Sequence, residues 1–106
     1  MLESQFQAAL IRELKELFPG CVVLKNDPTY IQGFPDLLIL YKNKWAALEC
    51  KASERSKVRP NQAYYVDVLH DMSFADFISP ETKEAVLDDL QQAFLSGRAA
   101  RISQRQ

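Results

Sequence analysis

The stretch from Gly33 to Lys51 constrains the fold of this chain more than any other part of the sequence. It predicts two apolar strands joined by a tight polar turn at residues 42–44. Residues 37–41 form a short continuous apolar run, which is typical of a strand covered on both faces. Because a tight turn makes the two strands antiparallel neighbours, the start of the first should lie beside the end of the second.

Three ionisable residues interrupt this apolar hairpin, namely Asp36, Glu49 and Lys51. Strand side chains alternate between faces, so Glu49 and Lys51 share one face while Leu48 and Cys50 point to the other. Asp36 stands at the start of the first strand and should therefore lie near the end of the second. Since a charge buried without a partner is costly, we expect two carboxylates and an ammonium group to meet at one edge of the sheet.

Such a cluster suits a hard divalent cation. Mg²⁺ binds a few carboxylate oxygens, keeps several waters and completes its shell with substrate phosphate. The ion polarises a phosphoryl oxygen and lowers the pKa of a bound water, and Lys51 would orient that water or stabilise charge on the phosphate. The alternative is a surface ion pair between Glu49 and Lys51 beside an ordinary Pro-Asp turn. A separation of 13 positions between Asp36 and Glu49, with a strand at each, favours the metal site.

Pro35-Asp36 followed by Glu49-Cys50-Lys51 resembles the P-D…(D/E)-x-K signature of the PD-(D/E)xK nuclease superfamily. The sequence resembles in particular the virus-type replication-repair nuclease branch (VRR-NUC), which is similar to archaeal-type Holliday-junction resolvases. The bare motif is short and degenerate, so its specificity comes from the order, the spacing and the secondary-structure context of its residues. The resemblance covers roughly residues 3–70.

The resemblance implies a mixed sheet flanked by helices and the metal-dependent hydrolysis of DNA phosphodiester bonds. Asp36 and Glu49 would bind Mg²⁺ or Mn²⁺ with help from the backbone carbonyl of Cys50, and Lys51 would position or activate the attacking water. A domain this small offers one active site and little surface for gripping DNA. Relatives with minimal domains act as homodimers on four-way junctions, so branched or Holliday-junction DNA is the expected substrate and a homodimer the expected assembly.

Glu3, Gly33 and Gln62 also fit the VRR-NUC branch, and two of them have a simpler explanation. Glu3 opens an amphipathic helix, where the helix dipole favours a carboxylate; in the family it would be a third acidic group that reaches the metal. Gln62 lies in the first turn of a helix that begins at Pro60. It either faces solvent or points back to the site, where it would act on a water or a phosphate, and the family pattern favours the site.

The net charge of −1 is not typical of a strongly basic DNA-binding domain. Between positions 42 and 59, however, six basic residues stand against two acids. Phosphate affinity depends on such local clusters, although solvated loop charge is the alternative explanation. Because they lie close in sequence to the proposed metal site, we expect five of them to contact DNA, namely Lys42, Lys44, Arg55, Lys57 and Arg59.

A chain of 106 residues is long enough for one domain only. We expect a nuclease domain over residues 1–97 and a basic tail over 98–106. No apolar run is long enough to span a bilayer, and the first residues lack the pattern of a secretory signal, so no membrane partner is expected. Cys21 and Cys50 lack metal-binding spacing, and we interpret them as small buried residues of an intracellular, cytoplasmic protein.

The remaining periodicity predicts an α/β fold with a mixed central sheet, in the order α-β-β-β-α-β-α. Expected helices cover residues 3–18, 60–70 and 80–96, the last with Ser79 as its cap and Pro80 in the first position, and expected strands cover 21–25, 37–41, 45–51 and 73–78. Two other functions compete with the nuclease: a non-catalytic nucleic-acid-binding module on the same fold, and an interaction protein in which the charges are merely paired. Asp36, Glu49 and Lys51 together favour the enzyme, because a non-catalytic relative would have little reason to keep three costly groups.

Overall fold

Helices and strands follow one another in the predicted order α-β-β-β-α-β-α, which confirms the α/β class. The computed structural model describes residues 2–95, so the predicted basic tail at 98–106 lies outside the described residues. The elements are α1 (Glu3–Leu17), β1 (Val22–Lys25), β2 (Leu37–Tyr41), β3 (Lys44–Cys50), α2 (Pro60–Met72), β4 (Ala75–Ile78) and α3 (Lys83–Leu95). Among residues 2–95, no helix is both long and apolar enough to cross a membrane.

One mixed sheet holds the strands in the order β1-β2-β3-β4. β2 pairs antiparallel with β1 and with β3, whereas β3 and β4 are parallel. A parallel pair needs a long crossover connection, and α2 supplies it. In the β2–β3 pair Leu37 lies opposite Leu48, so the start of β2 sits beside the end of β3, as the hairpin prediction requires.

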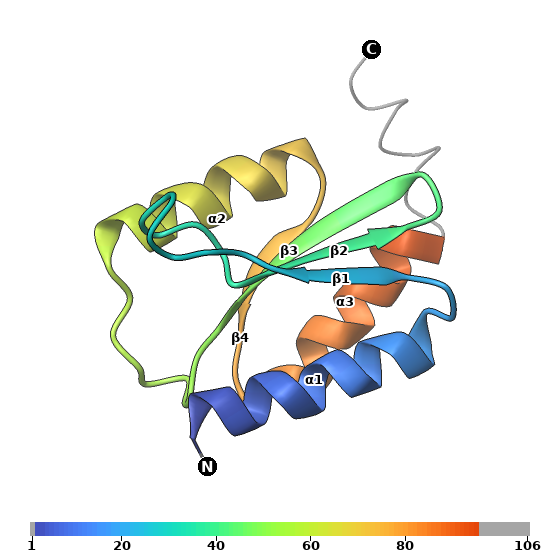
Figure 1. Ribbon diagram of the computed structural model, residues 1–106, viewed down its shortest axis with the longest axis horizontal. Helices are drawn as coiled ribbons and strands as arrows, with labels where there is room; N and C mark the ends of the chain where they lie inside the picture. Colours follow the sequence, from blue (N-terminus) through green and yellow to red (C-terminus); the bar gives the residue numbers. More distant parts are fainter. Residues whose placement is uncertain (1, 96–106) are drawn as a thin grey trace.

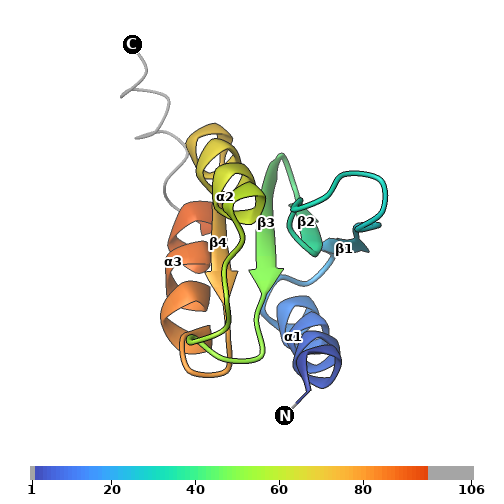
Figure 2. The same ribbon diagram turned by 90° about the vertical axis from the view of Figure 1, so that its left-hand side faces the viewer.

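The helices cover the two faces of the sheet unequally (Figures 1 and 2). α1 and α3 lie on one face and enclose the larger core, whose largest fully buried side chains include Phe18, Leu10, Leu14, Ile39 and Leu90. α2 lies on the other face, where its main strand contacts are with β3 and β4. Beneath it is a smaller cluster made of Ala47, Val66, Leu69 and Ala75.

The expectation that residues 37–41 are covered on both faces is wrong. Leu37, Ile39 and Tyr41 are buried, but Leu40 is 38% exposed. The reason is that α2 lies over β3 and β4 and leaves the same face of β2 uncovered. The strand with both faces covered is β3, which has five consecutive buried residues at 46–50.

The last helix begins at Lys83, three residues later than the Ser79-Pro80-Glu81 pattern predicts. Ser79 and Thr82 instead form a closed turn, in which the N–H of Ser79 donates to Oγ1 of Thr82 at 3.0 Å and the N–H of Thr82 donates to the carbonyl of Ser79 at 3.1 Å. The first helical bond runs from the N–H of Val86 to the carbonyl of Thr82. Thr82 is thus the residue directly before the helix, where a cap would stand, and Ser79 belongs to the turn that precedes it.

Candidate active site

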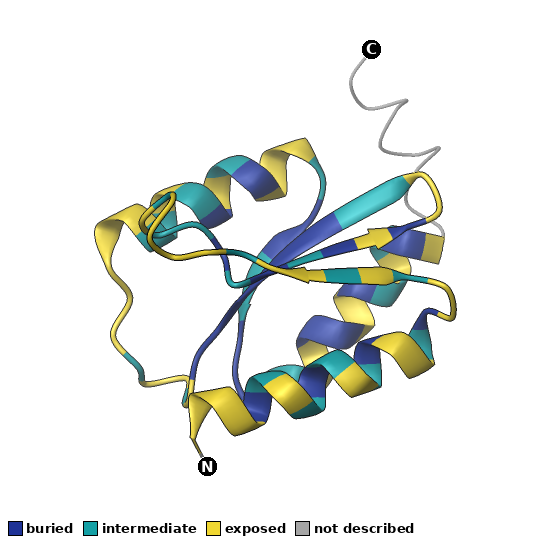
Figure 3. Cartoon of the chain, viewed as in Figure 1, coloured by how far each residue is buried: buried dark blue, intermediate teal, exposed yellow. Residues whose placement is uncertain are grey.

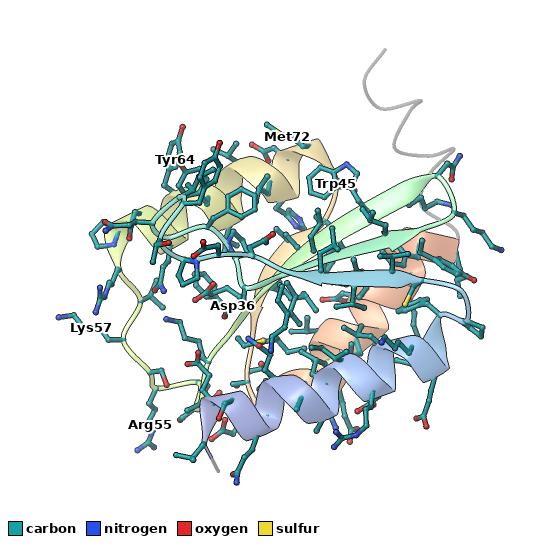
Figure 4. The ribbon with its side chains drawn as sticks, viewed as in Figure 1. Asp36, Trp45, Arg55, Lys57, Tyr64 and Met72 are labelled. Carbon is teal, nitrogen blue, oxygen red and sulfur yellow. The ribbon has the colours of Figure 1, made fainter. Side chains whose placement is uncertain are left out.

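The predicted acidic residues lie at the edge of the sheet where β2 begins and β3 ends, and Figure 4 labels Asp36 there. Asp36 directly precedes β2, and its backbone carbonyl accepts a hydrogen bond of 2.8 Å from the N–H of Asn26. The side chain of Asn26 also donates to the carbonyl of Pro35 at 2.7 Å. Across the hairpin, the Asp36 carboxylate accepts the N–H of Cys50 at 2.9 Å. This bond holds Asp36 beside the end of β3, next to Glu49.

Gln62 connects the acidic residues to the lysine. Its side-chain Nε2 donates to Oε2 of Glu49 at 3.0 Å, and its Oε1 accepts from Nζ of Lys51 at 2.8 Å. The same Oε1 accepts the N–H of Arg59 at 3.0 Å, which satisfies one backbone group at the start of α2. Gln62 therefore points into the site rather than to solvent, and one side chain both caps α2 and bridges Glu49 to Lys51.

Lys51 is held by fixed partners on several sides. Besides Gln62, its Nζ donates to the backbone carbonyl of Lys57 at 2.9 Å and lies 3.9 Å from Oε2 of Glu49. Its side chain is only 11% exposed. An ammonium group has three N–H donors, and two of them are taken by Gln62 and the Lys57 carbonyl. The third is left for Glu49 or for a substrate group at this edge.

Burial of the carboxylates disfavours their charged forms. It raises the pKa of Glu49 to about 7, and the negative charge of Asp36 is the second cause, partly offset by Lys51. Burial likewise raises the pKa of Asp36, against the opposing hydrogen bond from the Cys50 N–H. A bound cation would favour the charged forms of both carboxylates and so offset the effect of burial and, at Glu49, of the Asp36 charge.

The donor set fits Mg²⁺ or Mn²⁺. Both prefer oxygen ligands, and the Asp36 and Glu49 carboxylates and the Cys50 backbone carbonyl are all oxygen donors. Within residues 2–95, no group of three or more His, Cys, Asp or Glu side chains is arranged to hold a metal ion. An ion at this edge would therefore take two carboxylates from the protein and fill its other positions with backbone, water or phosphate oxygens.

Glu3 lies in the first turn of α1. It is close enough to the same edge for the charges of Asp36 and Lys51 to affect its pKa. Burial raises its pKa, and the charge of Asp36 raises it further while Lys51 lowers it. The structure does not, however, join Glu3 with Asp36 and Glu49 in one three-carboxylate group. Both roles expected for Glu3 thus remain, and the helix-dipole role needs no further contact.

The five basic residues predicted to contact DNA fall into two groups. Arg55, Lys57 and Arg59 lie on the exposed loop between β3 and α2, which borders the acidic edge (Figures 3 and 4). Lys42 and Lys44 lie at the opposite end of the β2–β3 hairpin. Five strand residues at about 3.3 Å each put these two roughly 16 Å from the acidic edge. The structure therefore brings only the loop residues to the site.

Sequence reasoning missed the groups that anchor this loop. The carboxylate of Glu81 accepts the N–H of Glu54 at 3.2 Å and the hydroxyl of Ser53 at 3.4 Å, which ties the start of the loop to the turn before α3. The carbonyl of Lys57 anchors the other end through Lys51. A backbone carbonyl leaves no signature in a sequence, and Glu81 lies 27 positions from Glu54, so no local pattern could have identified either contact.

No protein-family model, curated protein or solved structure matches this chain. The resemblance to PD-(D/E)xK nucleases thus depends on the residues of the site alone. Those residues are adjacent in space as well as ordered in sequence, since Asp36 contacts the end of β3 and Gln62 bridges Glu49 to Lys51.

Proposed function

We propose that this protein is a divalent-metal-dependent DNA endonuclease that hydrolyses phosphodiester bonds. One observation carries the proposal: the buried carboxylate of Glu49 and the half-buried carboxylate of Asp36 lie together at one sheet edge, with Lys51 and Gln62 fixed beside them. A structural ion pair would need only Glu49 and Lys51. The additional acid raises the cost of the charged site, and a cation between the two carboxylates accounts for it.

Each residue has a distinct role in this proposal. Asp36, Glu49 and the Cys50 carbonyl hold Mg²⁺ or Mn²⁺. The bound ion supplies a polarised phosphoryl oxygen and a water of lowered pKa. Lys51 directs its remaining N–H toward that water or toward a phosphate oxygen, where its charge is most effective because the side chain is shielded from solvent. Gln62 touches neither reacting atom and acts by fixing the orientation of Glu49 and Lys51.

The proposed substrate is branched DNA, including Holliday junctions, cut by a homodimer in the cytoplasm. One domain presents one acidic site, so cutting two strands symmetrically requires two copies related by a two-fold axis. Arg55, Lys57 and Arg59 would contact the phosphates on either side of the scissile bond. Contacts of these residues with phosphates would release counterions from the DNA. This release would supply the affinity for DNA that the net charge of −1 does not.

The test is a cleavage assay on four-way-junction, linear duplex and single-stranded DNA, with Mg²⁺, with Mn²⁺ and with EDTA. Asp36→Asn and Lys51→Ala should each lower the cleavage rate by about 10²-fold or more while DNA binding persists. Lys15→Ala, an equal truncation of an exposed lysine on α1, is the matched control and should cut like the wild type.

The same assay separates the competing functions. Binding without cutting, independent of metal, would support the non-catalytic nucleic-acid-binding module. If the protein neither binds nor cuts any of the DNAs, the charges are merely paired and the chain is an interaction protein. Either result overturns the endonuclease.

A further inference from the structure

A cavity of about 310 Å³ lies beside the acidic edge. It is bounded by the loop over residues 52–59, by β4 and by the first part of α3, and Figure 2 shows this loop passing in front of β4 next to the start of α3. Asp36 and Glu49 do not line the cavity, but Lys51 does. The proposed nuclease chemistry leaves this cavity unexplained.

The walls of the cavity combine apolar surface with a few polar groups. Val58, Phe77 and Val86 supply apolar surface, while Ser56 and Asp76 supply a hydroxyl and a carboxylate. Sites for small organic groups have this composition, and about 310 Å³ is at the lower end of their range of roughly 300–1,000 Å³. The cavity therefore suits one compact, partly polar group.

The charges along the walls disfavour a phosphate as that group. Lys51 is the only cationic residue in the lining, and its Nζ already donates to Gln62 and to the Lys57 carbonyl. Asp76 adds a negative charge that would repel an anion. A wholly apolar group fits poorly as well, since it would cover the carboxylate of Asp76 without offering a hydrogen bond. The group should therefore carry no negative charge and should offer a hydrogen bond to Asp76. A neutral heteroaromatic ring with N–H donors on its edge does both.

We propose that this cavity takes one unpaired nucleobase of the DNA that is cut at the neighbouring acidic edge; the inference rests on the proposed endonuclease function. Phe77 and Val58 contact the faces of the ring. Asp76 accepts from an exocyclic amino group, because a carboxylate offers about four lone-pair positions and the N–H of Phe77, at 2.8 Å, uses one. The hydroxyl of Ser56 accepts the N–H of Ser53 at 3.1 Å and can donate its own proton to the base edge.

The position of the loop makes this arrangement possible for a DNA strand. Arg55, Lys57 and Arg59 are exposed on the same loop that forms one wall of the cavity, and Figure 4 shows Arg55 and Lys57 projecting away from the protein. A backbone that follows these cations passes along the rim, so a base can turn inward. The contacts of Glu81 and Lys51 anchor both ends of the loop, which keeps the wall in place.

This site would explain a preference for branched DNA. Moving a base out of a duplex costs a few kcal/mol, and the cost is smallest where the base is already unpaired. A base at a branch point or in a single-stranded arm would enter the cavity at little cost, whereas a fully paired base would not. Selectivity would then come from the cavity rather than from the acidic residues.

The experiment removes single bases from the DNA. A series of branched substrates, each with one abasic site at a different nucleotide near the cut, is cleaved by the wild-type protein. We expect one position at which base removal lowers kcat/KM about tenfold or more, as stacking one base on a protein side chain is worth roughly 1–3 kcal/mol. If no position differs from its neighbours, the inference is overturned while the endonuclease stands.

Variants of Ser56 connect that position to the cavity. Ser56→Phe fills the cavity with a ring and should cut the intact substrate about tenfold more slowly. It should cut the decisive abasic substrate as fast as the wild type does. Ser56→Ala controls for loss of the bond to Ser53, and Ala52→Phe places the same ring on an exposed residue outside the cavity. Equal slowing of both substrates by Ser56→Phe would contradict a base in this cavity.

The two proposals can fail separately. If no DNA is cut with any metal, the endonuclease is wrong. The abasic series is then measured by binding affinity in EDTA, where we expect base removal at one single position to weaken binding of the wild type and of Ala52→Phe, but not of Ser56→Phe. A uniform affinity along the series would refute the cavity assignment without reference to cleavage.

Discussion

Replacing Glu49 by glutamine should stabilise the metal-free protein and abolish the proposed DNA cleavage. Glu49 is only 5% exposed, and burial is the main reason that its pKa rises from 4.5 to about 7. Ionising Glu49 therefore costs more free energy in the folded protein than in the unfolded chain, so the charged residue lowers the stability of the fold. Glutamine keeps the shape and can still accept the Nε2 proton of Gln62, but it carries no charge at any pH.

The pKa difference sets the magnitude and the pH window of this effect. A rise of about 2.5 pKa units at about 1.36 kcal/mol each corresponds to about 3 kcal/mol. Because the folded-state pKa is the higher one, there is no penalty below pH 4.5, where Glu49 is protonated in both states. The penalty grows as the pH rises from 4.5 to about 7 and is complete above that. We therefore expect E49Q to gain about 3 kcal/mol over the wild type near pH 8 and almost nothing near pH 4.

Urea unfolding in EDTA, followed by the fluorescence of Trp45, measures both differences. The matched control is Glu16→Gln, the same change at an exposed position on α1, which should leave the free energy of unfolding within about 0.5 kcal/mol of wild type. Adding Mg²⁺ near pH 8 should raise the stability of the wild type, since a ligand of the folded state stabilises it, and should do little for E49Q.

A loss of stability in E49Q near pH 8 would refute this reasoning. It would mean that the ionised Glu49 contributes more through Lys51 and Gln62 than its burial costs, and that the site is a self-sufficient ion-pair network. The same stability difference at pH 4 and pH 8 would also contradict it, because the effect would then not come from the titration of Glu49.

Three further predictions concern the fold and the proposed DNA-binding surface. Gly33→Ala should lower the free energy of unfolding, measured in urea, by about 1–2 kcal/mol or more. The reason is that residue 33 has φ +86 and that a Cβ there would lie 2.6 Å from Cγ of Asn61. An unchanged unfolding midpoint would contradict that packing. Phe94→Ala should cost about 3–5 kcal/mol in the same assay, because Phe94 is 2% exposed and its ring centroid lies 5.0 Å from that of Phe18; a loss below about 1 kcal/mol would argue against this core. Lys57→Gln should reduce the slope of log affinity for DNA against log salt by about 1, and Lys42→Gln, at the remote end of the hairpin, should not; equal effects would mean that DNA covers both ends.

Local patterns in the sequence were enough to predict the order of the elements. The hairpin followed from two apolar runs around a polar turn, and its register placed Asp36 beside the end of β3 without any tertiary information. The covering of β2 could not be predicted in this way. Whether Leu40 is buried depends on where α2 lies across the sheet. A run of apolar residues has the same sequence pattern whether or not a helix covers it.

The candidate site was predictable to the extent that side chains define it. Residue type and strand alternation placed Glu49 and Lys51 on one face, but the partners that hold Lys51 include the backbone carbonyl of Lys57, which every residue type supplies. The cavity was missed for the same reason. Its walls come from a loop, a strand and a helix that are separate in sequence, so only their packing brings Ser56 near Asp76.

The packing of α2 explains why one glutamine can serve both the fold and the site. Under this helix the sheet presents two small residues, Ala47 and Ala75, which are 0% and 3% exposed. Small residues allow a helix to approach a sheet closely, and a close approach brings the first turn of α2 within reach of the end of β3. Gln62 can then cap the helix through Arg59 and still contact Glu49 and Lys51 at 3.0 Å and 2.8 Å. The short side chains at positions 47 and 75 thus set the geometry of charged groups that they do not touch, because the distance between α2 and the sheet determines whether Gln62 can bridge Glu49 and Lys51.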